Sequence, residues 1–161
     1  MGLEDEARFE DWMAAHVGVL HRIARAFASG ADQQDLMQEL MLAVWRAAPK
    51  FRGESAPSTF IFRVAHNCAL TWRRRETVRR RHEADYERLH VEEAGSPEAL
   101  LDALYAAIRR LDMLDRSLVL LALEGLSYGE IGAIHGLGES NVGARLTRAR
   151  KKLAELMEVK R

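Results

Sequence analysis

Cysteine, long apolar runs and net charge are all scarce or absent in this sequence. The single cysteine, Cys68, excludes a disulfide within the chain. No uninterrupted apolar run exceeds six residues, as in residues 118–123, whereas a helix needs roughly 20 to cross a bilayer. The first ten residues are acidic, where a secretory signal would need a basic and then an apolar stretch. We therefore expect a cytoplasmic protein without a membrane span.

Signatures of catalysis are missing as well. The sequence has no glycine-rich phosphate loop with a lysine, no paired-histidine metal motif and no cysteine with a histidine at ligand spacing. We expect no enzymatic activity, no catalytic residue, no metal and no cofactor. Cys68 falls on the apolar face of a predicted helix, so we interpret it as a buried thiol rather than a nucleophile or redox sensor. We interpret His66 nearby as a polar-face residue.

The net charge is zero, but the charges are segregated along the chain. Residues 46–82 carry a net charge of +8 and residues 116–161 of +3, whereas residues 1–45 carry −5 and residues 83–115 carry −6. Two basic zones separated by an acidic one indicate two contacts with a polyanion. Solvated helix faces that happen to cluster are the alternative interpretation.

Apolar residues recur every three or four positions through most of the sequence, and strand-like alternation occurs nowhere. In the first half this spacing predicts three helices: residues 9–27 ended by Gly30, a second capped by Asp32 and stopped at Pro49, and a third capped by Ser55. In the second half it predicts four, near residues 98–111, 115–124, 127–135 and 139–157. The prediction is an all-α fold of two small helical domains, residues 1–82 and 98–161, joined by a flexible linker, residues 83–97.

Residues 127–146 have the pattern of a helix-turn-helix: a serine cap, a short helix, a glycine-bearing turn and a second helix. The predicted core of the motif is Ile131, Ile134, Leu137, Val142 and Leu146. Its second helix would lie in a major groove. The candidate DNA contacts are Ser140, Asn141, Arg145, Arg148, Arg150, Lys151 and Lys152. A generic helical hairpin with a basic tail is the alternative, since basic residues also suit a helix C-terminus.

The predicted second helix has a polar, mostly acidic face beside an exposed leucine, which indicates a protein-binding surface. An ordinary solvated face is the alternative interpretation. The candidate residues are Asp32, Asp35, Gln38, Glu39, Leu42 and Arg46.

The loop after that helix combines an aromatic ring, a flexible turn, hydrogen-bonding groups and cations. Such materials can hold an unstacked base of single-stranded DNA. The candidates are Phe51, Arg52, Glu54, Ser55, Thr59, Arg63, Asn67, Arg73, Arg74 and Arg75. Phe51 as a simple core residue is the competing interpretation.

In their order and spacing, these segments resemble the sigma factors of bacterial RNA polymerase, specifically the extracytoplasmic-function class. Residues 35–46 resemble the family's core-polymerase-binding helix, and residues 51–55 with 59–67 resemble its loop and helix for the downstream promoter element. Residues 124–131 and 142–153 resemble its reader of the upstream element. The resemblance implies a transcription initiation factor with core RNA polymerase and promoter DNA as partners. The family often has an anti-sigma protein that clamps the two domains, which makes such a protein a further expected partner.

Two positions depart from the family. Gly143 stands where members often carry a lysine that can reach DNA, and Pro57 stands where they often have an aromatic or other large residue. Two other functions remain as alternatives: a helix-turn-helix regulator that does not join polymerase, and an interaction protein whose first domain titrates a partner.

Overall fold

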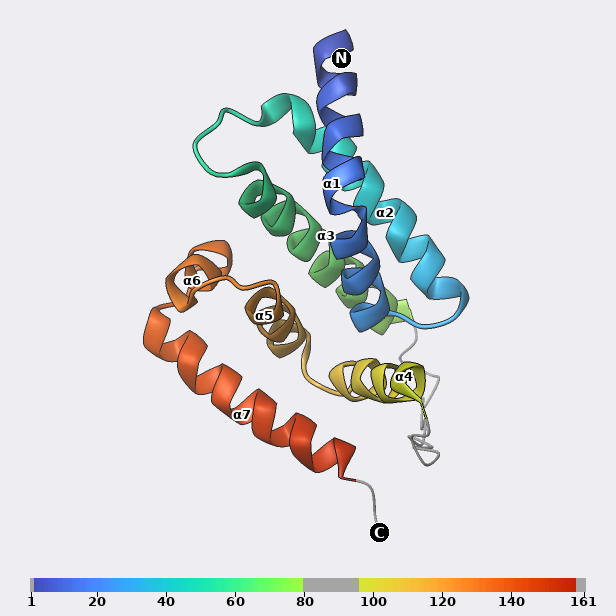
Figure 1. The fold of residues 1–161 in the computed structure, drawn as a ribbon, viewed down its shortest axis with the longest axis vertical. Helices are drawn as coiled ribbons and strands as arrows, with labels where there is room; N and C mark the ends of the chain where they lie inside the picture. The colour runs from blue at the N-terminus through green and yellow to red at the C-terminus, as the bar shows by residue number, and fades with distance from the viewer. Residues whose placement is uncertain (1, 80–95, 159–161) are drawn as a thin grey trace. The chain divides into compact units, whose positions relative to one another are not determined.

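Seven α-helices and no strand make up residues 2–79 and 96–158, which are the part of the chain that this computed structural model describes (Figure 1). The chain divides into two compact units, Met1–Glu76 and Thr77–Arg161. The predicted all-helical fold is confirmed. The predicted linker, residues 83–97, lies outside the described residues up to position 95.

Three long helices form the first unit. They are α1 (Leu3–Phe27), α2 (Ala31–Ala47) and α3 (Pro57–Arg79), and the short 3-10 helix η1 (Ala48–Lys50) follows α2 directly. Each long helix contributes buried side chains at three- and four-residue spacing, because that spacing returns to one face of a helix. Full burial of one Leu, Ile or Phe stabilises the fold by about 1.5–3 kcal/mol. The fully buried side chains include Leu20, Ile23, Phe27, Leu36, Leu40 and Ile61.

Both helix caps predicted for this unit are wrong. Helix α2 begins at Ala31 after Gly30, whose φ of 61° lies in the left-handed region, so Asp32 sits inside the first turn. Helix α3 begins at Pro57, and the Ser55 hydroxyl donates to the Ala56 carbonyl at 3.3 Å. Proline suits the first helical position because its φ is fixed and the missing N–H would have had no partner within the helix.

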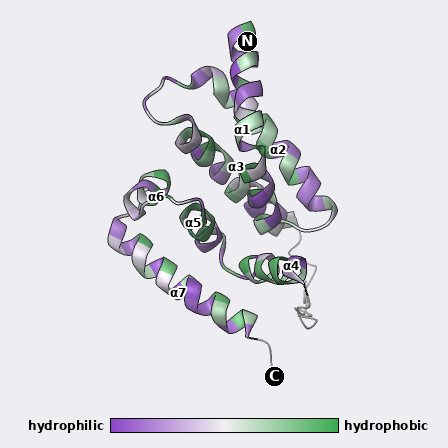
Figure 2. Cartoon of the chain, viewed as in Figure 1, coloured by the Kyte–Doolittle hydropathy of each residue, from purple (hydrophilic) through white to green (hydrophobic). Residues whose placement is uncertain are grey.

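Four shorter helices form the second unit: α4 (Pro97–Ile108), α5 (Met113–Leu123), α6 (Tyr128–His135) and α7 (Glu139–Met157). Figure 2 shows polar and apolar residues in alternating bands along α7, as an amphipathic helix requires. The predicted Ser127 cap is confirmed: its hydroxyl accepts from the Glu130 N–H at 3.1 Å, and the Glu130 carboxylate accepts from the Ser127 N–H at 3.1 Å. This reciprocal pair is a capping box, which marks where α6 begins. Hydrogen bonding of the Glu130 carboxylate to the Ser127 backbone N–H, and secondly to the Ser127 side chain, lowers the pKa of Glu130.

The turn between α6 and α7 is built on a close backbone approach. The Leu137 N–H donates to the Gly132 carbonyl at 2.9 Å, and a Cβ added to Gly132 would lie 2.3 Å from the Leu137 carbonyl oxygen. Ile131, Ile134, Val142 and Leu146 are buried as predicted, and Leu137 is half-buried. The predicted helix-turn-helix is therefore present, with Gly132 at its tightest point.

Two polar side chains that sequence reasoning missed stabilise the second unit from inside. Buried Arg116 donates from Nε to the Leu111 carbonyl at 2.9 Å and from Nη2 to the Arg109 carbonyl, which closes the turn between α4 and α5. Ser117 Oγ lies 2.7 Å from His135 Nε2, which links α5 to the end of α6. Burial lowers the pKa of His135, so the folded unit favours the neutral imidazole.

Candidate protein and nucleic-acid interfaces

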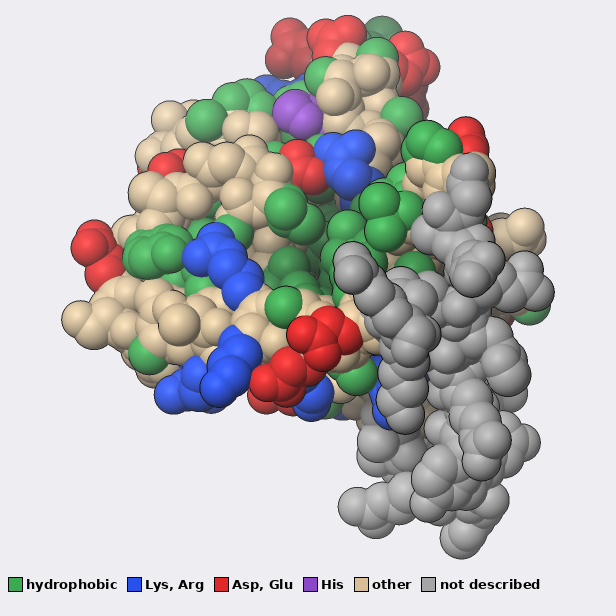
Figure 3. Space-filling view, turned by 60° about the horizontal axis from the view of Figure 1, so that its bottom comes forward, with side chains coloured by type: hydrophobic (Ala, Val, Ile, Leu, Met, Phe, Trp, Pro, Cys, Tyr) green, Lys and Arg blue, Asp and Glu red, His purple; other side chains and the backbone are tan. Residues whose placement is uncertain are grey.

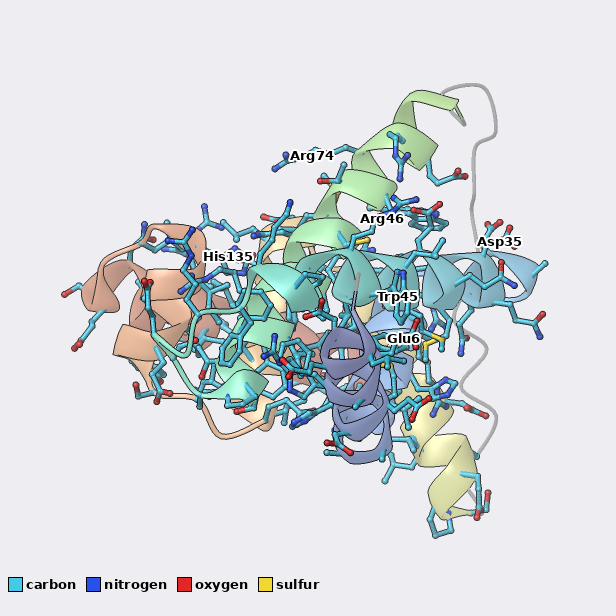
Figure 4. The ribbon with its side chains drawn as sticks, turned by 90° about the horizontal axis from the view of Figure 1, so that it is seen from above. Glu6, Asp35, Trp45, Arg46, Arg74 and His135 are labelled. Carbon is cyan, nitrogen blue, oxygen red and sulfur yellow. The ribbon has the colours of Figure 1, made fainter. Side chains whose placement is uncertain are left out.

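The outward face of α2 combines charge with an exposed apolar side chain. Asp35, Gln38, Leu42 and Arg46 are exposed, Leu42 by 45%, whereas Asp32 and Glu39 are half-buried. In Figure 4, Asp35 and Arg46 extend from one side of α2, and Trp45 lies toward α1, where its ring meets Phe9 edge-on at 5.0 Å. The core of the unit is therefore complete without Leu42, which leaves this face available for another protein.

Glu39 and Cys68 connect α2 to α3 at the edge of that face. The Glu39 carboxylate lies 3.8 Å from the Arg75 guanidinium, and the Cys68 thiol donates to the Glu39 carbonyl at 3.6 Å. Burial, and secondly the Glu39 charge, raise the pKa of Cys68, while Arg75 acts in the opposite direction. The thiol is half-buried rather than fully buried, and its raised pKa disfavours the reactive thiolate.

The loop after η1 is anchored by its aromatic residue. The Phe51 ring lies 5.3 Å from the Trp12 ring and 5.1 Å from the Phe60 ring, and Phe51 is half-buried. Beyond it, Arg52, Gly53 and Glu54 are exposed, and Gly53 has a φ of 74°. The structure thus engages Phe51 in an aromatic cluster, here defined as Trp12, Phe51 and Phe60, and presents the next three residues to solvent.

Helix α3 separates the predicted DNA-binding residues onto different faces. Arg63, Asn67 and Arg74 are exposed and recur at four and seven positions, which places them on one face of the helix. Figure 4 shows Arg74 projecting from the C-terminal part of α3. Arg75 instead reaches Glu39 of α2, while Arg73 and Thr59 are half-buried. We call Arg63, Asn67 and Arg74 the α3 outer face.

The interpretation of His66 as a polar-face residue is wrong. It is fully buried, beside Ala65 and Ala69 on the inner side of α3. The reason is helical spacing: position 66 lies four residues from buried Phe62 and three from Ala69.

In α7 the predicted DNA contacts divide between an outer face and two edges. Ser140, Asn141, Arg148, Lys151 and Lys152 are exposed. At one edge, Arg145 is only 30% exposed, and its Nη1 donates to the Asp115 carboxylate at 3.0 Å and lies 3.8 Å from Asp112. Arg145, one of the predicted DNA contacts, is therefore held by carboxylates at the start of α5.

At the other edge of α7, Tyr128 occupies the surface beside Gly143. The Arg150 guanidinium lies 3.4 Å from the Tyr128 hydroxyl, to which it donates, and a Cβ at position 143 would meet the Tyr128 ring at 3.3 Å. Tyr128 is 39% exposed. Sequence reasoning missed Tyr128 as a surface residue. The available signal was its position directly after the Ser127 cap, because the first residue of a helix commonly lies at the surface.

Within the described residues, no group of three or more His, Cys, Asp or Glu side chains could hold a metal ion. No helix in the same residues is long and apolar enough to span a membrane. On the face drawn in Figure 3, Lys and Arg side chains form separate small groups beside Asp and Glu side chains.

Two sequence-family models match the chain. Sigma-70 region 2 matches residues 12–79, which include α2, the loop and α3, and Sigma-70 region 4 matches residues 101–153, which include the helix-turn-helix. The ECF RNA polymerase sigma factor SigM of Mycobacterium tuberculosis H37Rv is 29% identical over 156 residues, covering 95% of this chain and 79% of that protein. The ECF RNA polymerase sigma-E factor of Escherichia coli K12 is 31% identical over 147 residues, covering 81% of this chain and 76% of that protein.

The fold is also that of a solved sigma factor. RpoE of Bartonella quintana, crystallised with the anti-sigma factor NepR, matches with a TM-score of 0.73 at 23% identity, covering 95% of this chain and 98% of RpoE. The two matched regions, in this order and with these relatives, show that the chain belongs to the extracytoplasmic-function class of the sigma-70 family, whose members bind RNA polymerase and direct it to promoters.

Proposed function

We propose that each of the surfaces described above has a separate role in transcription initiation. The outward face of α2 binds core polymerase, the loop with the α3 outer face holds the downstream element, and α7 reads the upstream element. The corresponding domains are residues 1–82 and 98–161, with residues 83–97 as linker. The observation that carries this proposal is the separation of surfaces within the first unit: Leu42 and Asp35 lie outward on α2, while Arg63, Asn67 and Arg74 share another helix.

For the downstream element, the structure favours holding a base by polar groups near the loop, with the aromatic cluster as support. Opening a duplex unstacks bases at a cost of a few kcal/mol, which stacking and hydrogen bonds in a pocket can offset. Asn67 offers an amide donor and acceptor, and Arg63 and Arg74 flank it along the helix with positive charge for phosphates. The proposed loop surface also includes Phe51, Arg52, Glu54 and Ser55. At its edge we place Thr59, Arg73 and Arg75.

We expect Asn67→Ala to lower initiation on a duplex promoter about tenfold, equivalent to about 1.4 kcal/mol. Affinity for core polymerase should stay near that of the unchanged chain, because Asn67 is exposed on α3 and not on α2. A template already mismatched open at the downstream element should restore most of the activity. The control is His21→Ala, an exposed residue of α1, a helix to which no DNA contact is assigned. Equal loss on closed and pre-opened templates would contradict base capture.

For the upstream element, we propose that Ser140, Asn141 and Arg148 face the groove from α7. Lys151, Lys152 and Arg150 would contact phosphates further along the helix. Arg145 would join them from its edge by exchanging the Asp115 carboxylate for a phosphate. Since Arg145 must first leave that partner, we expect it to contribute less to recognition than Arg148.

We expect Arg148→Ala to reduce the preference for promoters that carry the upstream element, by about 1–3 kcal/mol if the guanidinium reads a base. Initiation on promoters with a scrambled upstream element should change little. The matched control is Arg110→Ala, an exposed arginine in the turn before α5. A uniform loss across both promoters would instead identify Arg148 as a phosphate contact.

A direct test of the whole proposal is reconstitution of initiation from the purified chain, core polymerase and a cognate promoter. A helix-turn-helix regulator would need a separate sigma factor in the same assay, and a pure interaction protein would bind no DNA.

We also propose that the chain has no covalent chemistry of its own, acts in the cytoplasm and has an anti-sigma protein as partner. The complex of Bartonella quintana RpoE with NepR supports this last point, and copurification with such a protein tests it.

A further inference from the structure

We propose that Arg8, in the N-terminal part of α1, is a positioning residue for the loop after η1 and thereby for strand opening. The inference rests on the proposed function of that loop and of the α3 outer face. Arg8 lies before residue 12, where the match to Sigma-70 region 2 begins.

Three contacts join Arg8 to the start of the loop or hold it in place. Its Nη1 donates to the Ala48 carbonyl at 3.1 Å, across 40 positions of sequence. The centre of its guanidinium lies 6.0 Å from the centroid of the Phe51 ring, within the range of a cation–π contact. The same Nη1 lies 3.7 Å from the Asp5 carboxylate, one turn earlier on α1.

The Ala48 carbonyl is the point at which these contacts meet the loop. Ala48 is fully buried, and its carbonyl also accepts the Phe51 N–H at 3.3 Å. A carbonyl oxygen has two lone pairs, so it can accept from Arg8 and Phe51 together. Arg8 therefore binds the carbonyl that also anchors the Phe51 N–H, and its guanidinium lies over the Phe51 ring, at the residue from which the loop departs.

The remaining support for the loop comes from the same side of α1. Trp12 follows Arg8 by four residues, and its ring lies 5.3 Å from Phe51 and 5.7 Å from Phe60, the latter in the first turn of α3. Figure 1 shows the N-terminal part of α1 beside the segment that joins α2 to α3. Residues of α1 therefore contact both ends of the loop. Arg8 contacts the end that precedes Arg52 and Glu54.

Direct DNA binding by Arg8 is disfavoured by its surroundings. The first turn of α1 carries Glu4, Asp5 and Glu6, which repel a phosphate, and the guanidinium already donates to Ala48 and pairs with Asp5. Its side chain is 35% exposed. A positioning role requires only that the contacts with Ala48 and Phe51 persist.

The test compares Arg8→Ala and Arg8→Lys with the unchanged chain, each bound to core polymerase. For Arg8→Ala we expect unchanged affinity for polymerase, faster hydrogen exchange at the amides of residues 51–55, and about tenfold slower strand opening on a duplex promoter. A template mismatched open at the downstream element should restore most of the initiation. Arg8→Lys should recover part of the opening rate, because an ammonium can still donate to the Ala48 carbonyl.

Unchanged exchange at residues 51–55 in Arg8→Ala would overturn the inference, and so would faster exchange with normal strand opening. If Asn67→Ala impairs opening and Arg8→Ala does not, only the role of Arg8 fails. If neither variant impairs opening, the proposed function of the loop fails with it. A general loss of folding would appear as faster exchange in α1 and α2 in Arg8→Ala and Arg8→Lys alike, which would also refute a local positioning role.

Discussion

Gly132→Ala is expected to destabilise the helix-turn-helix, because the added Cβ makes a closer contact there than at any other glycine in the described residues. The new Cβ would lie 2.3 Å from the Leu137 carbonyl oxygen, a backbone atom that can move only if the turn opens. The Leu137 N–H bond to the Gly132 carbonyl would be strained by the same movement. Overpacking of this kind costs about 1–3 kcal/mol, and occasionally more. Urea unfolding should therefore show a lower midpoint, and recognition of the upstream element should weaken.

Gly129→Ala is the matched control. It lies in the same helix, and its added Cβ would be closest to the end of the Glu139 side chain, 2.8 Å from Oε1, which can rotate away. Alanine is also the better helix former, by about 1 kcal/mol. We expect Gly129→Ala to be neutral or stabilising. If both variants unfold at the same urea concentration, the turn tolerates the methyl group and the close approach at Gly132 has no energetic importance.

Asp35→Arg is expected to weaken binding to core polymerase about tenfold or more, equivalent to at least about 1.4 kcal/mol. Reversing a charge at an electrostatically complementary interface replaces an attraction by a repulsion. Asp35 is preferable to Glu39 for this test, because Glu39 also pairs with Arg75 and its replacement would disturb the contact between α2 and α3. Titration of labelled chain with core polymerase measures the affinity.

Glu10→Arg provides the control for total charge. It makes the same change in net charge at an exposed position of α1. We expect its affinity for polymerase to remain within about twofold of the unchanged chain at physiological salt, where screening limits long-range effects to about 8 Å. Leu42→Ala should also weaken binding, since its 45% exposed side chain contributes apolar area to the same face. Normal binding by Asp35→Arg would refute the assignment of α2 to polymerase.

Helix positions could be predicted from the sequence because they depend on neighbours in the chain. The capping box of Ser127 and Glu130 spans three positions, and the core of the helix-turn-helix repeats at helical spacing, so both follow from local rules. The caps predicted at Asp32 and Ser55 are wrong because other residues set the helix starts. Helix α2 begins earlier, directly after Gly30, and helix α3 begins later, at Pro57. The residue at which a helix starts therefore depends on more than its own capping side chain.

The functional residues show the same division between what the linear sequence predicts and what only folding decides. Residue order alone was enough to recognise the sigma-70 regions, the acidic face of α2 and the basic α7, because motifs and charge are properties of the linear chain. The partners of individual side chains were decided only by the tertiary structure: Arg145 is held by Asp115, Arg75 by Glu39, and Phe51 by Trp12 and Arg8. These pairs lie 30 to 43 positions apart, where no helical period relates them. Only the packing of one helix against another brings such groups within reach, which is why folding determines which arginines remain available for DNA.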